Sequence, residues 1–353
     1  MKRLFSLYIN KVYTGSVFSI VLCLPLFLLT SCGVHELPED GGVDPTVVHT
    51  TIVLLPGADM TPFDIPEFST RAADGHTYEV RYQVEVYADD KYDQNLQFRR
   101  TLTYPEGYTG EVALECDLHA RNYRVVAWRD FVPAGTSDDC FYSTEDFSAI
   151  KLNGDYVGGT DYKDVFSGQV SLNLTSYHCD LETEHREEMR LERPLAKIML
   201  VTTDVIKYFD NLKQTENKIA ADDRTTSRTT DVEDLTLKVL YSGYFPTGFD
   251  LSLNRPNKVD TGVSFSSVPI SISDTEACLA FDYVLVNGAQ SAVTVDMIIY
   301  NKDGVEVNSI GGVEIPIERN KITTVRDAFL TRDFDPSIGV DPSFNGEINV
   351  VIP

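Results

Sequence analysis

The feature that most constrains the fold of this chain is an alternation of apolar and polar residues with a period of two. It is clearest at Thr77–Tyr87, where Tyr and Val occupy every second position and charged or amide side chains lie between them. Successive side chains of a β-strand point to opposite faces, so the pattern predicts a strand with one buried face. Further strand-like segments follow along the chain, at residues 51–55, 96–104, 112–114, 123–128, 170–174, 195–201, 235–241, 277–286, 293–300, 305–310, 312–318, 321–326 and 347–353.

Only a few segments predict something other than a strand. Thr203 or Asp204 is suited to cap a short helix that runs to Asn217, and the polar stretch 222–231 is typical of a loop. Asn301-Lys302-Asp303-Gly304 predicts a hairpin turn in which the Asp-Gly pair supplies the positive φ angles. Many short strands with few helices indicate an all-β protein built from antiparallel β-sandwiches.

The strands fall into two series that meet near Arg193-Pro194. A chain of 353 residues is long for one β domain and comfortable for two. We therefore predict two β-sandwich domains in tandem, at residues 49–192 and 193–353. The residue-level repeat signal between them is weak.

The N-terminal segment has the three parts of a secretory signal. Lys2, Arg3 and Lys11 give it a basic start, and residues 17–29 are almost wholly apolar. That run is too short to span a bilayer, which needs about 20 apolar residues. The segment ends in Leu29-Thr30-Ser31-Cys32, with small residues directly before a cysteine. A short buried helix or an ordinary signal peptide would not require that ending.

This ending resembles the bacterial lipobox. The resemblance implies cleavage between Ser31 and Cys32, with residues 1–31 as the signal peptide and Cys32 as the lipid attachment site in the outer membrane. One acyl chain holds a protein only marginally, whereas the three chains implied here give a stable anchor. Residues 32–48 begin with an acidic stretch rich in Gly and Pro, which predicts a flexible tether. A short acidic stretch after the lipid cysteine also resembles the surface-export signal of Bacteroides-type lipoproteins, which favours the cell surface over the periplasmic face.

The charge of the chain excludes some partners. Its formal net charge is −24, and it falls to about −27 without residues 1–31 because they carry three cations and no acid. Nucleic-acid binding needs a basic footprint, which is missing, and adhesion to anionic lipid headgroups by charge is excluded for the same reason. The acidity is typical of a soluble surface.

Four cysteines remain beyond Cys32, and an exported compartment permits disulfides between them. Four cysteines allow three pairings, and burial as small apolar residues is equally compatible with the sequence. They are Cys116, Cys140, Cys179 and Cys278.

No catalytic motif and no cofactor-binding motif is present, so we expect no enzyme activity and no cofactor. The sequence contains no GxGxxG, no P-loop, no G-x-S-x-G and no H-E-x-x-H. The nearest approach to a zinc site matches no closed-site spacing, and a solvated linker is the simpler interpretation; its residues are His178, Cys179, Glu182, Glu184, His185 and Glu188. We therefore predict no metal site there.

Two other features of the sequence could form a ligand-binding site. Asp138-Asp139 and Asp222-Asp223 could attract calcium, but neither has the acidic alternation and late Glu of an EF-hand loop. Trp128 and the many Tyr and Phe residues could stack on sugars. Because Trp128 lies in an apolar strand, a place in the sandwich core is the favoured interpretation.

Three sets of motifs together are similar to a known family. The first set comprises Tyr123–Trp128, Asp130-Phe131-Val132 and Asp161–Phe166. The second is Arg193-Pro194-Leu195-Ala196-Lys197-Ile198, and the third comprises Ile315–Arg326 with Gly339–Ile348. They resemble the fimbrillin-like, Mfa-type lipoproteins of Bacteroides-type bacteria, which are the subunits and anchors of type V pili.

The resemblance covers nearly all of the chain beyond the signal. It implies two transthyretin-like β-sandwich domains and export to the surface as a lipoprotein. In polymerising subunits of that family, a trypsin-like protease cuts after an arginine, and loss of the first strand opens a groove that a strand from the next subunit fills. An open edge offers unpaired backbone groups, and a partner strand satisfies them. Anchor subunits keep their N-terminus and lipid.

This sequence has parts that match that scheme. Residues 51–55 are suited to be the first strand, and Arg71-Ala72 lies in a polar stretch before the strand at Tyr78. Arg71 is also readable as an ordinary loop arginine. The strand at residues 348–352 is either a donor to another subunit or a member of its own sheet.

We therefore expect a structural component of cell-surface fimbriae, as anchor, accessory or minor subunit, whose partners are other fimbrial subunits. The alternative is a surface lipoprotein adhesin that binds glycan or host protein through aromatic loops. A hydrolase is a distant third interpretation.

Overall fold

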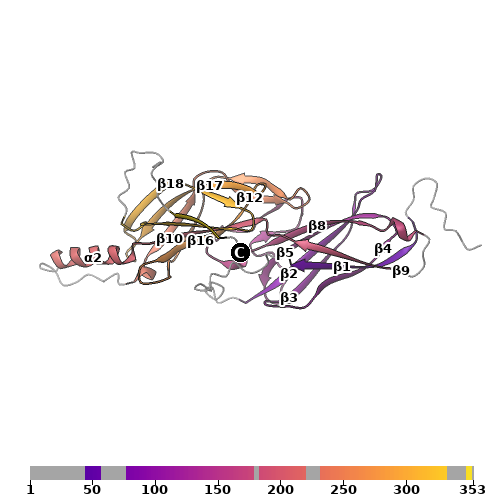
Figure 1. Cartoon of the computed structure of the whole chain (residues 1–353), viewed down its shortest axis with the longest axis horizontal. Coiled ribbons are helices and arrows are strands. Elements are labelled where there is room, and N and C mark those ends of the chain that lie inside the picture. The colour runs from indigo at the N-terminus through magenta and orange to yellow at the C-terminus, as the bar shows by residue number, and fades with distance from the viewer. Residues whose placement is uncertain (1–43, 57–76, 179–182, 220–230, 332–346, 352–353) are drawn as a thin grey trace, which may run out of the picture. The chain divides into compact units, whose positions relative to one another are not determined.

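The computed structural model describes residues 44–56, 77–178, 183–219, 231–331 and 347–351, and Figure 1 shows their strands and helices. Two of the sheets are built from strands of the first half of the chain. One has the order β4(Val112–His119), β1(Val47–Pro56) and β9(Thr183–Leu191). The other has the order β3(Leu96–Pro105), β2(Tyr78–Ala88), β5(Asn122–Pro133) and β8(Phe166–Asn173).

Three further sheets involve the second half of the chain. The first has the order β13(Arg255–Asp260), β12(Phe245–Asp250), β7(Ile150–Leu152) and β6(Tyr142–Ser143). The second has the order β15(Ile270–Ser271), β16(Ala277–Leu285), β10(Leu195–Thr202), β19(Ile322–Asp327) and β20(Glu347–Val351). The third has the order β14(Val263–Ser267), β11(Thr236–Tyr241), β17(Gln290–Tyr300) and β18(Glu306–Glu318).

The described helices are few and short. They are η1(Asp161–Lys163), η2(Thr175–Tyr177), η3(Val232–Asp234) and α2(Val205–Ile219). The predicted all-β class is confirmed, and the predicted helix is present as α2, one residue beyond Asp204. The Asp204 carboxylate accepts the backbone N–H groups of Leu330 at 3.3 Å and Thr331 at 2.7 Å, so it joins the start of α2 to the chain that leaves β19.

Two details of the predicted strands differ. β10 pairs with β16 in the antiparallel sense but with β19 in parallel, so the sheets are not all antiparallel. β10 and β16 are buried along their whole length because both of their faces are covered, one by each of two core clusters. In the turn at Asn301–Gly304 only Gly304 has a positive φ, of 74°. The N–H of Asn301 donates to the carbonyl of Val305 and closes that hairpin.

Glu184, His185 and Glu188, which belong to the stretch that we interpreted as a solvated linker, lie in the strand β9, so that interpretation was wrong for these residues. The side chains of β9 alternate, with Glu184, Arg186, Glu188 and Arg190 exposed. On the opposite face only Met189 and Leu191 are buried. The strand is hard to detect from sequence because its inner face carries so few large apolar residues.

The chain divides into two compact units that differ from the predicted cut at residue 193. Among the described residues, one comprises 44–50, 116–121, 173–178 and 183–185, and the other comprises the described parts of 51–115, 122–172 and 186–351. The second unit therefore contains segments from both sides of residue 193. The domain boundary at that residue stays a prediction.

A core cluster within the second unit joins these segments. Trp128, which is fully buried, packs with Tyr142 at 5.6 Å and with Phe249 at 6.0 Å between ring centroids. The same cluster includes Met199 of β10 and Phe281 of β16. Apolar residues of β5 and of the later strands thus share one interior.

Candidate functional site

The first candidate site is β1 and its two neighbours. Val, Ile and Thr dominate its sequence, and such β-branched residues favour strands. β1 is the central strand of its sheet, with β4 on one edge and β9 on the other. Val48 and Ile52 are fully buried, and Leu54 is nearly so. Both edges and one face of β1 are therefore satisfied within the chain.

The residues that sequence analysis singled out for processing lie outside the described residues. These are Ser31, Cys32, Arg71 and Ala72. β1 ends at Pro56 and β2 begins at Tyr78, so Arg71 lies in the connection between these two strands.

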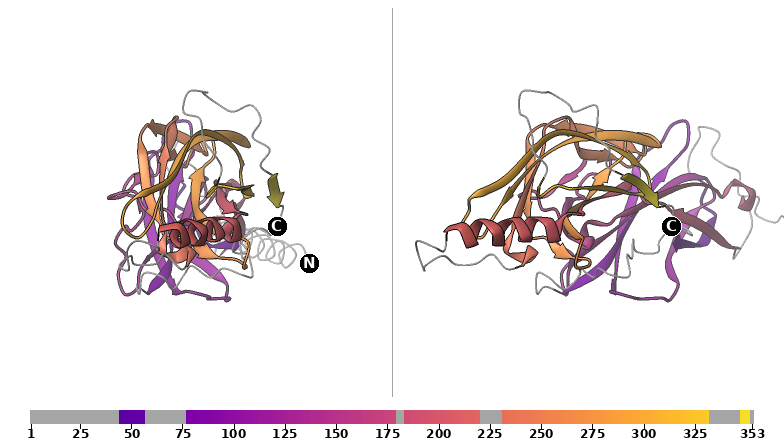
Figure 2. Two further views of the ribbon diagram at one scale, coloured as in Figure 1. Left: turned by 90° about the vertical axis from the view of Figure 1, so that its left-hand side faces the viewer. Right: turned by 60° about the vertical axis from the view of Figure 1, so that its left-hand side comes forward.

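The second candidate site is the last strand. β20 pairs only with β19 and lies at the edge of its sheet, in an antiparallel register that matches Ile322 with Val351. Figure 2 shows β20 as the outermost strand of that sheet. The chain between them is fixed at its start by the hydrogen bonds from Leu330 and Thr331 to Asp204.

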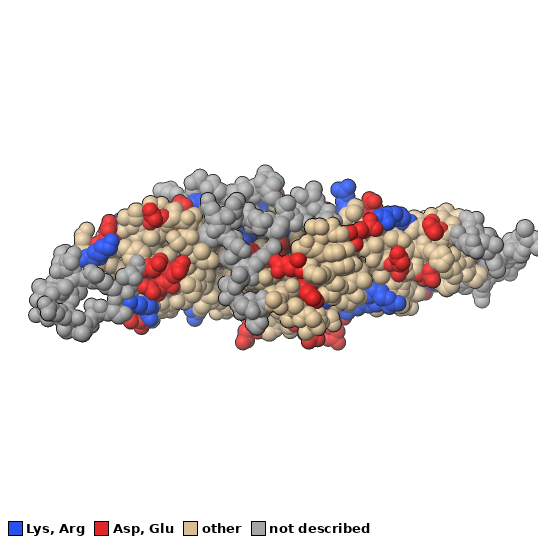
Figure 3. All heavy atoms as spheres, turned by 90° about the horizontal axis from the view of Figure 1, so that it is seen from below, with Lys and Arg blue, Asp and Glu red and all other residues tan. Residues whose placement is uncertain are grey.

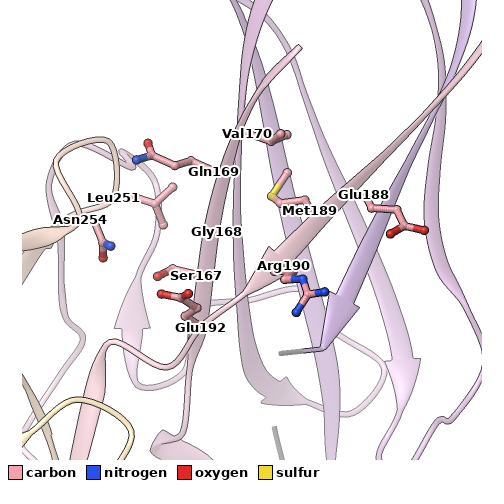
Figure 4. A pocket seen from close by; sticks show the side chains of 10 residues that line it. All are labelled: Ser167, Gly168, Gln169, Val170, Glu188, Met189, Arg190, Glu192, Leu251 and Asn254. Carbon is pink, nitrogen blue, oxygen red and sulfur yellow. The ribbon is translucent and has the colours of Figure 1, made fainter. Parts of the chain in front are cut away.

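The third candidate site is the opening between β8 and β9. Each strand is the last in its sheet, and the two are joined by a single bridge between Ser167 and Glu192. Beyond that bridge they separate around a pocket of about 240 Å³, which Figure 4 shows. Val170, Met189 and Leu251 give it an apolar part.

Gly168 sets how closely the two strands approach. A Cβ at this position would lie 2.5 Å from the carbonyl oxygen of Arg190 and 2.8 Å from a methyl carbon of Leu191. Only glycine therefore fits where β9 crosses β8, which explains why a glycine lies inside the strand β8.

The most concentrated chemistry in the described residues is a buried cluster of charges. Lys163 of η1 lies with its Nζ 2.7 Å from Oδ1 of Asp282 in β16, and the two side chains are 2% and 0% exposed. The Asp282 carboxylate also accepts the hydroxyls of Tyr156 and of Tyr241, the latter at 2.7 Å. Every oxygen of this buried carboxylate thus has partners, as burial of a charge requires.

The ionisation of these groups follows from their burial. Burial lowers the pKa of Lys163, and the negative charge of Asp282 opposes that effect. Burial and the charge of Asp282 both raise the pKa of Tyr156 and of Tyr241 well above the ordinary value. The two phenols therefore stay protonated and serve as donors, and nothing in this arrangement resembles an activated nucleophile.

Two neighbouring pairs extend the cluster. Asp161 accepts from Lys197 Nζ and from the Tyr283 hydroxyl, each at 2.7 Å. Asp164 binds the guanidinium of Arg193 through two bonds of 2.7 and 2.9 Å. Such bidentate pairs are both strong and geometrically specific.

This cluster unites two motifs that the sequence presented separately. Three charged residues of Asp161-Tyr162-Lys163-Asp164 bind Lys197, Asp282 and Arg193, respectively. Two of these partners belong to the second motif, Arg193–Ile198. The only signal in the sequence was that each motif carries charged residues whose signs complement those of the other motif. Neither motif alone shows which residues it contacts.

A second buried ion pair lies within the first half of the chain. Arg81 of β2 binds Asp130 of β5 through bonds of 2.9 and 2.6 Å, and its Nη2 lies 2.8 Å from Asp139. Asp139 also accepts from the backbone and hydroxyl of Thr144. Asp139 belongs to the Asp138-Asp139 pair that we considered for calcium. Its carboxylate instead binds Arg81 and Thr144, and it thereby holds a loop against the sheet. Asp222-Asp223 lies outside the described residues.

Trp128 does not form a sugar-binding surface. It is fully buried, which confirms its predicted place in the core. The acidic stretch near His178 also serves other contacts: His178 binds Asp44, and His185 binds the hydroxyl of Tyr177 at 2.9 Å. Cys179 and Glu182 lie outside the described residues. Within the described parts of the chain, no three His, Cys, Asp or Glu side chains gather as a metal site would require.

Of the four cysteines considered for disulfides, Cys278 is a buried thiol whose Sγ contacts the carbonyl of Ala280 at 3.5 Å. Burial raises the pKa of Cys278 to about 12, so it stays protonated at neutral pH. The pairing of Cys116, Cys140 and Cys179 stays open.

The surface carries charges of both signs. On the face shown in Figure 3, acidic and basic side chains of the described residues are interspersed. No helix among the described residues combines the length and the apolar character needed to cross a membrane.

The five sheets of the described residues define an all-β protein. The chain belongs to the family of unknown function DUF6562, whose model matches residues 45–353. No curated protein matches it.

Several solved structures are similar to this chain at low sequence identity. The fimbrial anchor protein Mfa2 from Porphyromonas gingivalis has 10% identity and a TM-score of 0.39, covering 85% of this chain and 95% of its own. A candidate adhesin from Bacteroides ovatus has 12% identity and a TM-score of 0.41, covering 79% and 89%. A candidate polysaccharide-binding protein (DUF1812) from Bacteroides thetaiotaomicron has 12% identity and a TM-score of 0.41, covering 75% and 80%. An Mfa-type protein, the kind named from the sequence motifs, is thus among these structures.

Proposed function

We propose that this chain is a structural component of cell-surface fimbriae, acting as anchor, accessory or minor subunit, and that it assembles by β-strand addition. The observation that carries the proposal is the position of β1. This strand is hydrogen-bonded on both edges, by β4 and β9, and Arg71 follows it before β2 begins. Cleavage after Arg71 would leave β1 attached only by non-covalent contacts.

Departure of β1 would expose two strand edges at once. β4 and β9 would each lose a row of backbone partners, and the apolar contacts of Ile52 and Leu54 would be vacated. Unpaired edges with vacant side-chain pockets are what an incoming strand satisfies. The proposed acceptor is therefore the space of β1, filled by a strand of another fimbrial subunit.

The proposed donor, if this chain also donates, is its last strand. β20 has one neighbour and terminates its sheet, so its exchange would break pairing with β19 alone. Exchange of a strand with two neighbours would break two ladders of backbone hydrogen bonds, whereas exchange of β20 would break one. This makes β20 the least costly strand of its sheet to exchange, apart from the short β15.

Membrane attachment belongs to the same proposal. Residues 1–31 would be removed, Cys32 would carry the lipid in the outer membrane, and the tether predicted at residues 32–48 would be shorter, because Asp44 is buried and β1 begins at Val47. The body itself would consist of transthyretin-like domains at 49–192 and 193–353. An anchor would keep this lipid, whereas a polymerising subunit would lose it together with β1.

The alternative, an adhesin for glycan or host protein, drew its sequence support from Trp128. Because that side chain is buried, it gives the alternative no support.

The mature N-terminus of the protein from intact cells tests the role. A start at Ala72 indicates a processed, polymerising subunit, and palmitate labelling on Cys32 indicates an anchor. Cys32→Ser should abolish labelling and release the protein from the membrane fraction. A wild-type protein without acylation would refute the anchoring part.

Arg71→Ala tests the processing part. It should block the start at Ala72 and prevent incorporation into fibres, because β1 would stay covalently joined to β2. Arg255→Ala, which changes an exposed arginine in β13, is the matched control and should leave both unchanged. Normal processing and assembly of the Arg71→Ala variant would exclude Arg71 as the cleavage site.

A further inference from the structure

A tight turn after β3 brings two tyrosines together. In Tyr104-Pro105-Glu106-Gly107-Tyr108, the N–H of Tyr108 donates to the carbonyl of Pro105 at 3.1 Å. Gly107 has a φ of 79°, which the third position of a type II turn requires. The rings of Tyr104 and Tyr108 stack with centroids 4.4 Å apart and planes inclined by 23°.

Further contacts hold this pair in place. Tyr82 of β2 meets Tyr104 edge to face at 6.0 Å, so the inner ring rests on the sheet. The hydroxyl of Tyr108 donates to the carbonyl of Glu111 at 3.3 Å. A Cβ at Gly110 would lie 2.3 Å from that hydroxyl oxygen, so the ring position of Tyr108 depends on a glycine there.

The outer ring is nevertheless open to solvent. Tyr108 is 46% exposed although one of its faces is covered by Tyr104. Tyr92 and Tyr244 are more exposed, at 79% and 77%, but neither takes part in a ring stack among the described residues. Tyr108 is thus an exposed aromatic ring that is fixed before any ligand arrives, which reduces the entropy lost on binding.

Two glutamates near Tyr108 in the chain are held by other side chains. Arg186 binds Glu111 through two contacts of 2.6 and 3.4 Å, and both side chains are about half exposed. Glu106, in the turn itself, accepts from the hydroxyl of Tyr162 at 3.3 Å. Carboxylates and a guanidinium that are already held in position are suitable partners for ligand hydroxyls.

We propose that the Tyr104–Tyr108 pair is a carbohydrate-binding platform on which a neutral pyranose ring stacks against Tyr108. Because the two tyrosines are stacked, they present one flat face, which matches the flat apolar face of a sugar ring. An anionic glycan would be repelled by a chain with a net charge of −24.

The stacked pair lies outside the strands of the proposed assembly, since Tyr104 belongs to β3 and Tyr108 to the turn after it, although Arg186 belongs to β9, which borders β1. The test uses the full-length protein without its signal peptide and four soluble neutral oligosaccharides: cellohexaose, maltohexaose, xylohexaose and mannohexaose. Saturation-transfer difference NMR and calorimetric titration report binding. We expect at least one to bind with millimolar affinity or better, and Tyr108→Ala to weaken it about tenfold.

Variants separate stacking from other causes. Tyr108→Phe should retain most of the affinity because it keeps the ring, and Gly110→Val should weaken binding because it displaces the ring. Tyr92→Ala and Tyr244→Ala are matched controls that should bind like the wild type. Absence of binding to all four oligosaccharides would overturn the proposal, as would equal losses in Tyr108→Ala and Tyr92→Ala.

Discussion

At the scale of single residues, Lys163 and Asp282 form the most demanding contact. Lys163→Ala would leave the Asp282 carboxylate buried without its cation. Removing one partner of a buried pair costs about 3–5 kcal/mol. We expect the free energy of unfolding to fall by about that amount in urea denaturation followed by circular dichroism.

The matched controls separate burial from charge. Lys213→Ala removes an exposed pair on α2, in which Nζ lies 3.6 Å from Asp210. It should change stability by no more than about 0.5 kcal/mol. The double variant Lys163→Met, Asp282→Asn should be more stable than Lys163→Ala, because no unpaired charge is left and the amide oxygen still accepts the tyrosine hydroxyls. A Lys163→Ala variant as stable as Lys213→Ala would contradict this account.

Asp44 gives stability a dependence on pH. Burial alone would raise the pKa of Asp44, but hydrogen bonds from His178 and from the Thr46 backbone outweigh it and hold the pKa below the ordinary 3.8. A carboxylate with a depressed folded-state pKa contributes stability above its unfolded value and loses it as pH falls through the folded one. We therefore expect Asp44→Asn to flatten the acid side of a pH–stability curve measured below pH 3.8. If the variant lost stability below pH 3.8 as steeply as the wild type, Asp44 would not be the source of that loss.

At the scale of elements, the crossing of β8 and β9 depends on Gly168. A methyl group there must displace the Arg190 carbonyl or the Leu191 side chain. Gly168→Ala should therefore destabilise the protein by about 1–3 kcal/mol in chemical denaturation. Gly311→Ala is the control, because its Cβ would come no nearer than 3.4 Å to another atom and should cost about 0.5 kcal/mol at most. Equal effects would show that backbone entropy, and not the crossing, determines the result.

At the scale of the whole molecule, the core around Trp128 connects segments on both sides of residue 193. The chain has one tryptophan, and its ring packs against Tyr142 and Phe249. Because this cluster joins both halves, we expect Trp128 fluorescence and far-ultraviolet circular dichroism to report one common unfolding transition. Two separated transitions would instead support independent domains divided at residue 193.

Local patterns predicted much of the fold. The alternation at Thr77–Tyr87 predicted β2, and the apolar run at 195–201 predicted β10, because side-chain periodicity is a property of the strand itself. The same reasoning failed for β9, whose inner face has few large apolar residues. It also gave no sign of short strands such as β6 and β7, which have too few residues to show a period.

Local sequence patterns were enough to predict the all-β class, the position of most strands and the charged motifs around Asp161 and Arg193. Only the tertiary structure decided that β1 lies between β4 and β9, that β10 and β19 run parallel, and that Lys163 meets Asp282. The reason is the distance along the chain that separates the residues involved. Periodicity is a property of neighbouring residues, whereas the parallel pairing of β10 with β19 and the ion pair of Lys163 with Asp282 each join segments more than one hundred residues apart.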